Sequence, residues 1–430
     1  MSVQASIKPR DAVVPQLEAG MTPEKLIDRA ANLRDLLRED QDAADERGHY
    51  SEQVHQEMKK SGLYRILQPK MFGGWEFEFP VLLKASIEIG RGHPSAAWCY
   101  TLASSHALIT GAYFPRDVQA ELFGDGHFAA PHKAIPAGTF TPTEGGYIAN
   151  GTWTFASGIP VATHFFGACM LPGENGGPPR PRNFVVEKSK VQVLKDWGGP
   201  EFSLGMQASG SNAVKLENVF IPHRHFMRAD NLIAQDPSGA GTYGTELHGN
   251  PMYLAIVGGA YHTTFGGIFT GTARAALDEF AEIMKRRPGH PMGGGSRMAD
   301  PTAVATYGKA MQLTDAAEEL TMAAGRMYMD QCFRWKRTGK PITPEDTLRL
   351  WGVAQEAVQL ANRATTMLFQ SSGATNIAPG KRMNRYFRDI QMYIVHPSAQ
   401  PSIAQMIGQT TLGINMNHFD MLKDPPKQPA

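Results

Sequence analysis

Three side chains of this sequence have the chemistry to hold or move a proton. His396 is followed directly by Pro397, which disfavours helical backbone at the preceding residue, so we expect His396 at the end of a helix. An imidazole with an ordinary pKa of about 6.5 can accept and return a proton near neutral pH. Ser157 precedes Gly158, where backbone could approach a flat ring, and His106 lies within a strongly apolar segment. Each also has a plain structural interpretation, as a buried hydrogen-bonded histidine or a serine in a turn.

Two further polar segments could bind a charged or polar ligand. Residues 209–211 (Ser-Gly-Ser) form a small polar loop, which could also be a simple turn between strands. Arg286, Arg287 and Arg297 lie in and around a loop rich in Gly and Pro. A guanidinium suits phosphate because it offers paired donors. The residues alone do not choose among the three arginines.

Composition argues against several classes of partner. The chain has 430 residues, 42% of them hydrophobic, and a net charge of +1, so nothing points to nucleic acid or an anionic membrane surface. Three scattered cysteines (Cys99, Cys169 and Cys332) predict buried thiols, with no disulfide framework and no metal site. The sequence shows no signal-peptide pattern and no apolar run of membrane-spanning length, so we expect a cytoplasmic protein. It also lacks GxGxxG and GxxxxGK[ST] phosphate loops.

The elements that position these residues are helices on either side of a strand-rich region. Thr22-Pro23-Glu24 combines a hydroxyl N-cap with proline at the first helical position, which begins a helix. Residues 94–113 are apolar on all sides and predict a buried helix. Gly145-Gly146 predicts a hairpin turn, and Thr152–Phe155 alternates as a strand. Residues 42–48 are charged, and we expect them to be solvated.

Helical patterns return after the strands, so the chain divides into three main parts. The Gly- and Ala-rich stretch from Ala255 to Phe280 permits close helix approach. Further helices are expected at 51–61, 80–90, 301–338, 344–372, 382–395 and 402–412. The expected domains are a flexible arm (1–20), an N-terminal helical domain (21–125), a central β domain (126–235), a C-terminal helical bundle (236–420) and a tail (421–430).

Five separated segments resemble the acyl-CoA dehydrogenase superfamily of flavoproteins, over roughly residues 20–420. The segments are 62–75 (GLYRILQPKMFGGW), 145–158 (GGYIANGTWTFASG), 197–222 (WGGPEFSLGMQASGSNAVKLENVFIP), 271–280 (GTARAALDEF) and 385–389 (RYFRD). Within this superfamily the chain is most similar to oxygenase components of two-component flavin-dependent monooxygenases, such as 4-hydroxyphenylacetate 3-hydroxylase. Where such a dehydrogenase can carry a Glu-Gly pair with its catalytic base, this chain has His396-Pro397.

The resemblance implies a fold, a reaction and partners. The fold would be α+β and acyl-CoA dehydrogenase-like, with an N-terminal helical domain, a central β-barrel domain and a C-terminal four-helix bundle, usually in a homotetramer. Reduced FMN or FAD from a separate NAD(P)H:flavin reductase would react with O2 to form a C4a-hydroperoxide, which hydroxylates a small phenolic or heteroaromatic substrate. The absence of a dinucleotide-binding motif is consistent with this reaction, because the electrons would come from the separate reductase.

The resemblance also assigns roles to particular residues. Ser157 would contact flavin N5, His396 would be the base, and His106 would face the substrate from the opposite side. Arg287 would reach the flavin phosphate of a neighbouring subunit. The residues expected to bind the cofactor are Trp153, Phe155, Ser157, Gln207, Ser209, Ser211, Arg287, Ser372 and Gly373. Arg385 and Asp389, four residues apart on one expected helix, have the spacing of a structural ion pair.

Three features depart from the family pattern and leave other functions open. The dehydrogenase carboxylate is absent at position 396, residues 129–134 (AAPHKA) lack the serines that often lie near a phenol, and Tyr261-His262 adds an imidazole without an assigned role. The alternatives are an acyl-CoA dehydrogenase or oxidase, an S- or N-monooxygenase of the same fold, and a non-catalytic helical assembly protein. Flavin bleaching by an acyl-CoA would favour the first.

Overall fold

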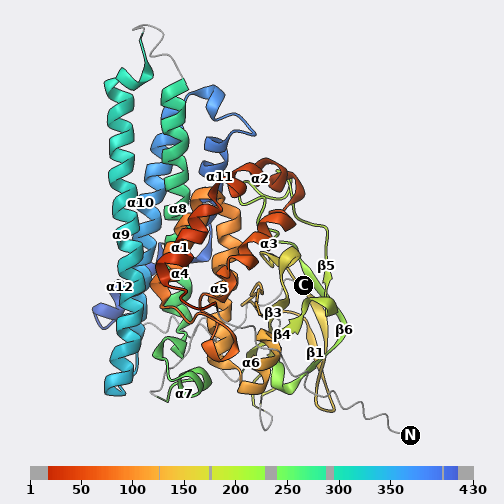
Figure 1. The fold of residues 1–430 in the computed structure, drawn as a ribbon. Coiled ribbons are helices and arrows are strands. Elements are labelled where there is room, and N and C mark those ends of the chain that lie inside the picture. The colour runs from red at the N-terminus through yellow and green to blue at the C-terminus, as the bar shows by residue number, and fades with distance from the viewer. Residues whose placement is uncertain are drawn as a thin grey trace.

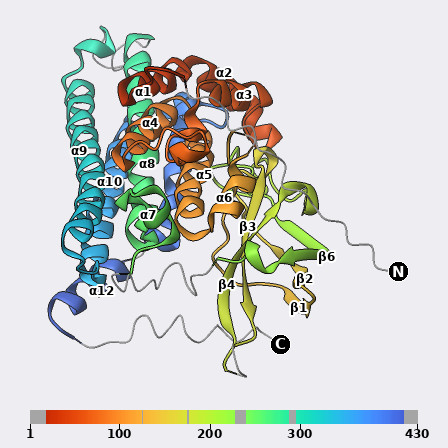
Figure 2. The same cartoon turned by 60° about the horizontal axis from the view of Figure 1, so that its bottom comes forward.

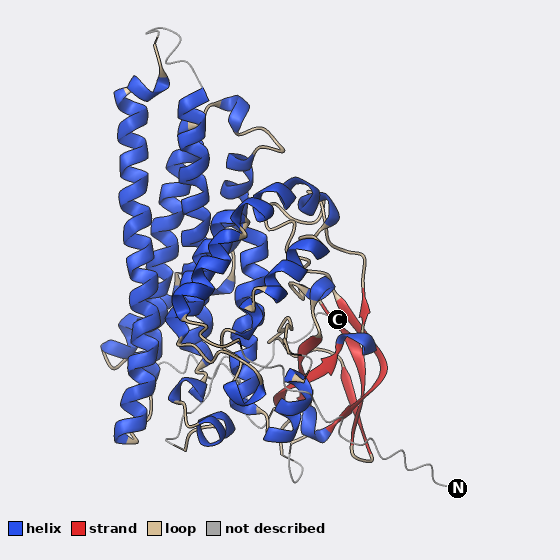
Figure 3. Ribbon diagram, viewed as in Figure 1, coloured by secondary structure: helices blue, strands red, loops and turns tan. Residues whose placement is uncertain are grey.

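The computed structural model describes residues 18–124, 126–173, 177–227, 240–286, 295–399 and 401–414. Helices form one side of the molecule and strands the other (Figures 1 and 3). Along the chain the order is helices, strands, helices, as the sequence predicts. Residues 1–17 of the predicted arm, the predicted tail and the expected end of the β domain at residue 235 lie outside the described residues.

The N-terminal helices begin where the sequence places caps. Thr22 Oγ1 accepts the Lys25 N–H at 3.3 Å, and Ser51 Oγ accepts the Val54 N–H at the same distance. The predicted solvation of 42–48 is confirmed only in part, because Asp42, Glu46 and Arg47 are exposed whereas Asp45 of the same helix is largely buried. The helices are α1 (Pro23–Asn32), α2 (Arg34–Arg47), α3 (Glu52–Lys60), α4 (Phe79–Gly92), α5 (Pro94–Tyr113) and α6 (Arg116–Phe123).

Helix α5 is buried along nearly its whole length, as predicted from its all-round apolar sequence. It lies between the long C-terminal helices and the strands in both ribbon views (Figures 1 and 2). No helix within the described ranges is long and apolar enough to cross a membrane. Helix α5 is therefore buried by the rest of the protein, and its residue His106 lies between the helical side and the strands.

The strands form two antiparallel sheets. One has the order β1-β2-β6-β5 and the other pairs β3 with β4, so pairing among the described strands does not close the expected barrel. Gly145, at φ +77°, makes the predicted turn between β1 and β2. The expected strand over 152–155 stops at Trp153. The strands are β1 (Thr139–Thr143), β2 (Gly146–Trp153), β3 (His164–Leu171), β4 (Arg180–Glu187), β5 (Gln192–Val193) and β6 (Val214–Pro222).

The C-terminal domain is built on four long helices that pack on one another: α8 (Val257–Arg286), α9 (Pro301–Thr338), α10 (Pro344–Ser371) and α11 (Arg382–Ile394). Two short helices, α7 (Tyr243–His248) and α12 (Ser402–Thr411), lie at its edge. Helix α8 also packs against α4, where a Cβ on Gly271 would lie 2.5 Å from the Ile87 carbonyl oxygen. Only glycine permits that approach, which confirms the close packing expected from the sequence.

Candidate active site

Three serine hydroxyls meet beside the turn that follows β2. Ser157 Oγ lies 2.8 Å from Ser211 Oγ, which lies 2.7 Å from Ser209 Oγ. The backbone holds the two loops together, because the Gly158 N–H donates to the Ser209 carbonyl oxygen at 2.8 Å. The structure thus brings together three residues that the sequence analysis selected from two distant segments.

The turn before Ser157 carries backbone strain and an exposed ring. Phe155 has φ +57°, which is unfavourable for a residue with a Cβ, and its side chain is 59% exposed. It contacts Trp197 edge-on, with ring centres 5.9 Å apart. An exposed aromatic ring held in a strained turn two residues from Ser157 could stack against a flat ligand.

Trp153 serves the sheet core and not the open side of this turn. It is 1% exposed, packs against Phe165 and Phe184, and donates its indole N–H to the Ala168 carbonyl oxygen at 2.9 Å. We therefore withdraw Trp153 from the set of cofactor contacts. Gln207 is also turned inward, because its amide donates to the Ser203 carbonyl oxygen at 3.0 Å.

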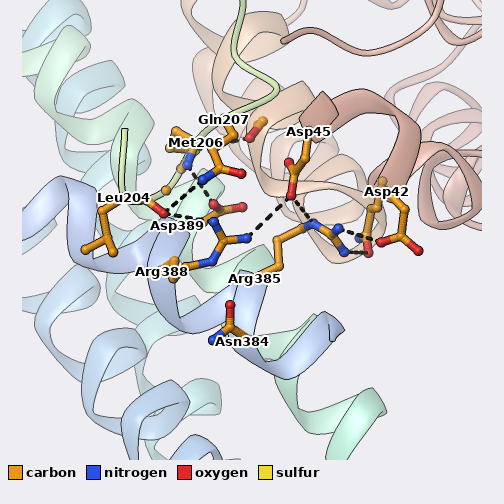
Figure 4. A network of polar contacts seen from close by, with 12 residues as sticks. Asp42, Asp45, Leu204, Met206, Gln207, Asn384, Arg385, Arg388 and Asp389 are labelled. Carbon is orange, nitrogen blue, oxygen red and sulfur yellow. Dashed lines mark hydrogen bonds and ion pairs between the residues drawn. The ribbon is translucent and has the colours of Figure 1, made fainter. Parts of the chain in front are cut away.

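A buried charge network fixes the loop that leads to Ser209 (Figure 4). Asp389 of α11 accepts the Met206 N–H at 2.7 Å, and Met206 itself has a strained φ of +54°. Arg388 of α11 donates to the Leu204 carbonyl oxygen at 2.9 Å. Burial, together with the Asp45 charge, raises the pKa of Asp389 to about 7. Helix α11 therefore positions the serine loop.

The ion pair suggested by the spacing of Arg385 and Asp389 is not formed. Arg385 points to α2 instead, where it donates to Asp45 at 2.9 Å and to Asp42 at 2.6 Å. Its side chain is 2% exposed, and Gln41 Oε1 accepts a further hydrogen bond at 3.1 Å. Arg385 is thus a structural link between the N-terminal and C-terminal domains.

A small enclosed cavity adjoins Ser157 on the side of α5. Its walls include Cys99 and Ala103 of α5, residues 129–131, and Tyr50 and Tyr64, whose hydroxyl oxygens lie 2.9 Å apart. The segment 129–131 is the one in which the sequence lacks the expected serines. Most of the wall is therefore apolar, and the polar groups at its edge are Ser157 and the two tyrosines.

His106 contacts one wall residue of this cavity, Ala130. Its Nδ1 is 2.7 Å from the Ala130 carbonyl oxygen, so Nδ1 carries the proton and Nε2 is left as an acceptor. Nε2 has no hydrogen-bond partner among the described residues. Burial lowers the pKa of His106 to about 3, which keeps the ring neutral. A buried, unpaired acceptor beside a cavity is suited to a donor on a ligand.

His396 lies at the C-terminal end of α11, as Pro397 predicts, in an aromatic surround. Its ring centre is 5.3 Å from that of Phe265 and 5.8 Å from that of Trp98. Burial, and secondarily the charge of Lys133, lowers the pKa of His396 to about 4. The ring is therefore neutral at physiological pH.

Ser398 determines which nitrogen of His396 carries the proton. The Ser398 N–H donates to His396 Nδ1 at 3.1 Å, so a neutral His396 must be protonated on Nε2. The rest of Ser398 is held firmly: its carbonyl oxygen accepts from Trp351 Nε1 at 3.1 Å, and its hydroxyl lies 3.0 Å from His262 Nδ1. The ring of His262 stacks on Trp351 at 3.4 Å between centres. The imidazole that the sequence left unassigned thus supports His396.

These contacts change the role expected for His396. With Nδ1 already occupied, the neutral ring offers a hydrogen-bond donor at Nε2 and no free acceptor. His106 has the opposite arrangement, with an acceptor at Nε2. This hydrogen bonding favours a donor role for His396 over the proton-accepting role that the resemblance implies.

The remaining predicted cofactor residues lie elsewhere. Ser372 is fully buried and donates to the Leu368 carbonyl oxygen at 2.7 Å, which is a helix-end contact next to Gly373. Arg297 donates to the Ser371 carbonyl oxygen, so it belongs to the same end of the helical domain. That end lies away from the strands in Figures 1 and 2. Arg286 pairs with Glu279 at 3.2 Å, and Arg287 lies outside the described residues.

The groups gathered at this site are aromatic and polar. An exposed ring at Phe155, a row of hydroxyls ending at Ser157 and a neutral imidazole at His396 suit a flat heterocycle with polar edges. No group of three or more metal-ligating side chains occurs in the part of the chain that the structure describes.

Comparison with known proteins gives the chain its family. Residues 263–401 match the model of the acyl-CoA dehydrogenase C-terminal domain. The oxygenase component of FADH(2)-dependent resorcinol hydroxylase from Rhizobium sp. is 26% identical over 91% of this chain and 94% of its own length. The oxygenase component of p-hydroxyphenylacetate 3-hydroxylase from Acinetobacter baumannii is 24% identical over 83% and 82%. The chain is an oxygenase component of the two-component flavin-dependent monooxygenase type.

The family fold agrees with a solved relative. XiaF from Streptomyces sp., in complex with FADH2 and glycerol, superimposes with a TM-score of 0.81 over 95% of this chain and 98% of its own, at 20% identity. The acyl-CoA dehydrogenase-like fold of this oxygenase component is thereby established. Sequence reasoning selected Ser157, Ser209, Ser211 and His396 as candidates. It did not select Ser398, which contacts His396 through a backbone N–H that leaves no signal in residue type.

Proposed function

We propose that this oxygenase component hydroxylates a small aromatic substrate with O2 and reduced flavin. A separate NAD(P)H:flavin reductase would supply FMN or FAD in its reduced form. Two electrons come from the flavin, one oxygen atom enters the new C–OH bond, and the other leaves as water. Relatives named for resorcinol and p-hydroxyphenylacetate support an aromatic substrate.

The observation that carries this proposal is the row of three serine hydroxyls that ends at the partly exposed Ser157. The row of serine hydroxyls would hold the flavin edge at N5, while Phe155 stacks on the ring system. His396 Nε2–H would donate to the oxygen of a phenol or phenolate, which orients the ring for attack. His106 Nε2 would accept a hydrogen bond from a ring substituent on the other side. The apolar cavity walls would keep water out.

Assembly into a tetramer would complete the cofactor site. Ser372, Gly373 and Arg297 lie together at the end of the helical domain away from Ser157, so they would serve a flavin held by a neighbouring subunit. Arg287 remains the proposed phosphate contact, with Arg297 as the alternative among the described residues. Equilibrium sedimentation with and without flavin tests this assignment.

Turnover tests the proposed reaction. The chain is mixed with a flavin reductase, NADH and panels of phenols, indoles and thiophenes, and hydroxylated product is counted against O2 consumed and hydrogen peroxide released. We expect product with at least one phenol or indole. Oxygen uptake that yields only hydrogen peroxide with every compound would contradict the proposal. Bleaching of bound flavin by an acyl-CoA would favour the dehydrogenase alternative.

A further inference from the structure

Lys133 places a positive charge beside the candidate site without an acidic partner. Its Nζ lies 5.5 Å from the centre of the Phe155 ring, the exposed ring of the strained turn before Ser157. No carboxylate among the described residues pairs with Nζ, and burial alone accounts for the lowered pKa of Lys133. This differs from the other buried cation near the site, Arg385, which is matched by two aspartates.

The backbone fixes the direction in which Lys133 points. The segment runs beside β3, where the Lys133 N–H donates to the Phe166 carbonyl oxygen at 3.0 Å. The preceding His132 turns toward Asn183, whose side-chain oxygen lies 2.9 Å from Nε2, and toward the His106 ring. Adjacent side chains of an extended segment point to opposite sides, so Lys133 points away from this cluster and over Phe155.

Lys133 also lies close enough to His396 to influence it. Its charge is the second cause, after burial, of the low pKa of His396. The ammonium therefore lies over Phe155 and within electrostatic range of His396. Residues 129–131 of the same segment line the cavity beside Ser157.

An unpaired, half-buried ammonium is costly unless an anion joins it. Desolvation of a cation is unfavourable, and an opposite charge within a few ångströms offsets that cost. Resting Nζ against the Phe155 ring compensates only in part. The chain retains a lysine here, in the segment where the hydroxyls near a phenol are missing.

We propose that Lys133 is an anion subsite for the substrate, so that the chain acts preferentially on aromatic acids whose carboxylate pairs with Nζ while the ring faces His396 and Ser157. This inference rests on the proposed function and specifies its substrate class. Reduced flavin can also carry a negative charge, so the experiment must distinguish a substrate carboxylate from the cofactor.

Matched pairs of ligands isolate the charge. 4-Hydroxyphenylacetate and indole-3-acetate are each compared with their primary amides, which keep the shape and lose the charge. Dissociation constants are measured calorimetrically on the full chain saturated with oxidised FMN, so that the readout does not depend on turnover. We expect at least one acid of the panel to bind roughly tenfold or more tightly than its amide, as for a charge-assisted hydrogen bond. Lys133→Met should abolish the preference, and Lys133→Arg should retain most of it.

Three results would overturn the inference. The first is that no acid of the panel binds more tightly than its amide. The second is that Lys133→Met leaves the preference for the acid intact. The third is that Lys133→Met weakens FMN binding, measured by fluorescence titration, while the affinities for acid and amide still differ. The melting temperature of Lys133→Met serves as the folding control, and Lys133→Gln provides a second neutral variant if Lys133→Met is unstable. Failure of the proposed function is recognised separately, as O2 consumption without product for neutral and acidic compounds alike.

Discussion

The hydrogen bond between the Ser398 N–H and His396 Nδ1 predicts that His396 acts as a donor and not as a base. Replacing His396 with alanine removes a hydrogen bond to a charged or developing phenolate oxygen, which is worth about 1.5–3 kcal/mol. At 1.36 kcal/mol per factor of ten, the rate of product formation should fall roughly 10- to 150-fold. His396→Gln keeps an N–H donor at a similar reach and should recover most of this loss.

The pH dependence separates the donor role from the base role. Because the folded pKa of His396 is about 4, its Nε2 proton is present both above and below the ordinary histidine value of about 6.5. The rate of product formation should therefore show no inflection due to His396 between about pH 5.5 and pH 8. The assay is single-turnover formation of hydroxylated product from pre-reduced flavin, which removes the reductase from the measurement.

One outcome would refute this reasoning directly. If the wild-type rate rises with pH through an inflection near 6.5, and His396→Gln abolishes that inflection, the imidazole accepts a proton and the Ser398 contact does not determine its role. Hydrogen peroxide release is followed in parallel. We expect His396→Ala to release more peroxide per O2 consumed, since flavin oxidation continues while oxygen transfer fails.

Three other predictions concern the framework. Arg385→Met should lower the free energy of unfolding by about 3–5 kcal/mol, because it leaves the largely buried Asp45 without its main partner. Asp42→Ala removes a carboxylate that is 77% exposed and should cost under about 1 kcal/mol. Urea unfolding at one protomer concentration compares the two variants, and equal losses would contradict the burial argument. Ser157→Ala should raise peroxide release per O2 more than Ser209→Ala does, because only Ser157 is partly exposed at the open end of the hydroxyl row; identical yields would remove Ser157 from the cofactor site. The folded pKa values of His55 and His396 (about 4) and of His106 (about 3) lie below the unfolded value of about 6.5, so their contribution to stability is fully present above pH 6.5 and is lost as the pH falls toward 4. The raised pKa of Asp389 acts in the opposite sense and offsets part of this loss. Thermal melts should show the decline in stability, with a shallower slope for His106→Gln.

The sequence predicted those parts of the fold that local chemistry determines. Helices α5 and α9 begin at prolines in the first helical position and extend over the predicted residues, and the Gly145 turn forms the expected hairpin. It failed for Asp45 of α2, which is largely buried although Asp42 and the other charged residues of its segment indicate solvation. Their partner Arg385 lies more than 300 residues away, and no local pattern carries that information.

The site was predictable in its residue types and not in its hydrogen bonds. Ser157, Ser209 and Ser211 could be selected because the resemblance places them in two matching segments, and the structure joins them. The protonation of His396 depends on a backbone N–H delivered by the turn at Ser398, and any residue except proline could supply it. Lys133 was not predicted as a site residue, because residues 129–134 differ from the family pattern mainly by the serines that they lack.

The anchoring of the Met206 loop by Asp389 has a consequence for biosynthesis. The loop that presents Ser209 and Ser211 is held by a carboxylate that follows it by 183 residues. A ribosome will have released the complete β-module long before α11 exists to fasten it, and contacts of such long range form late and slowly. Binding of the cofactor should therefore be among the last steps of folding, after α11 has packed against the loop that carries Ser209 and Ser211.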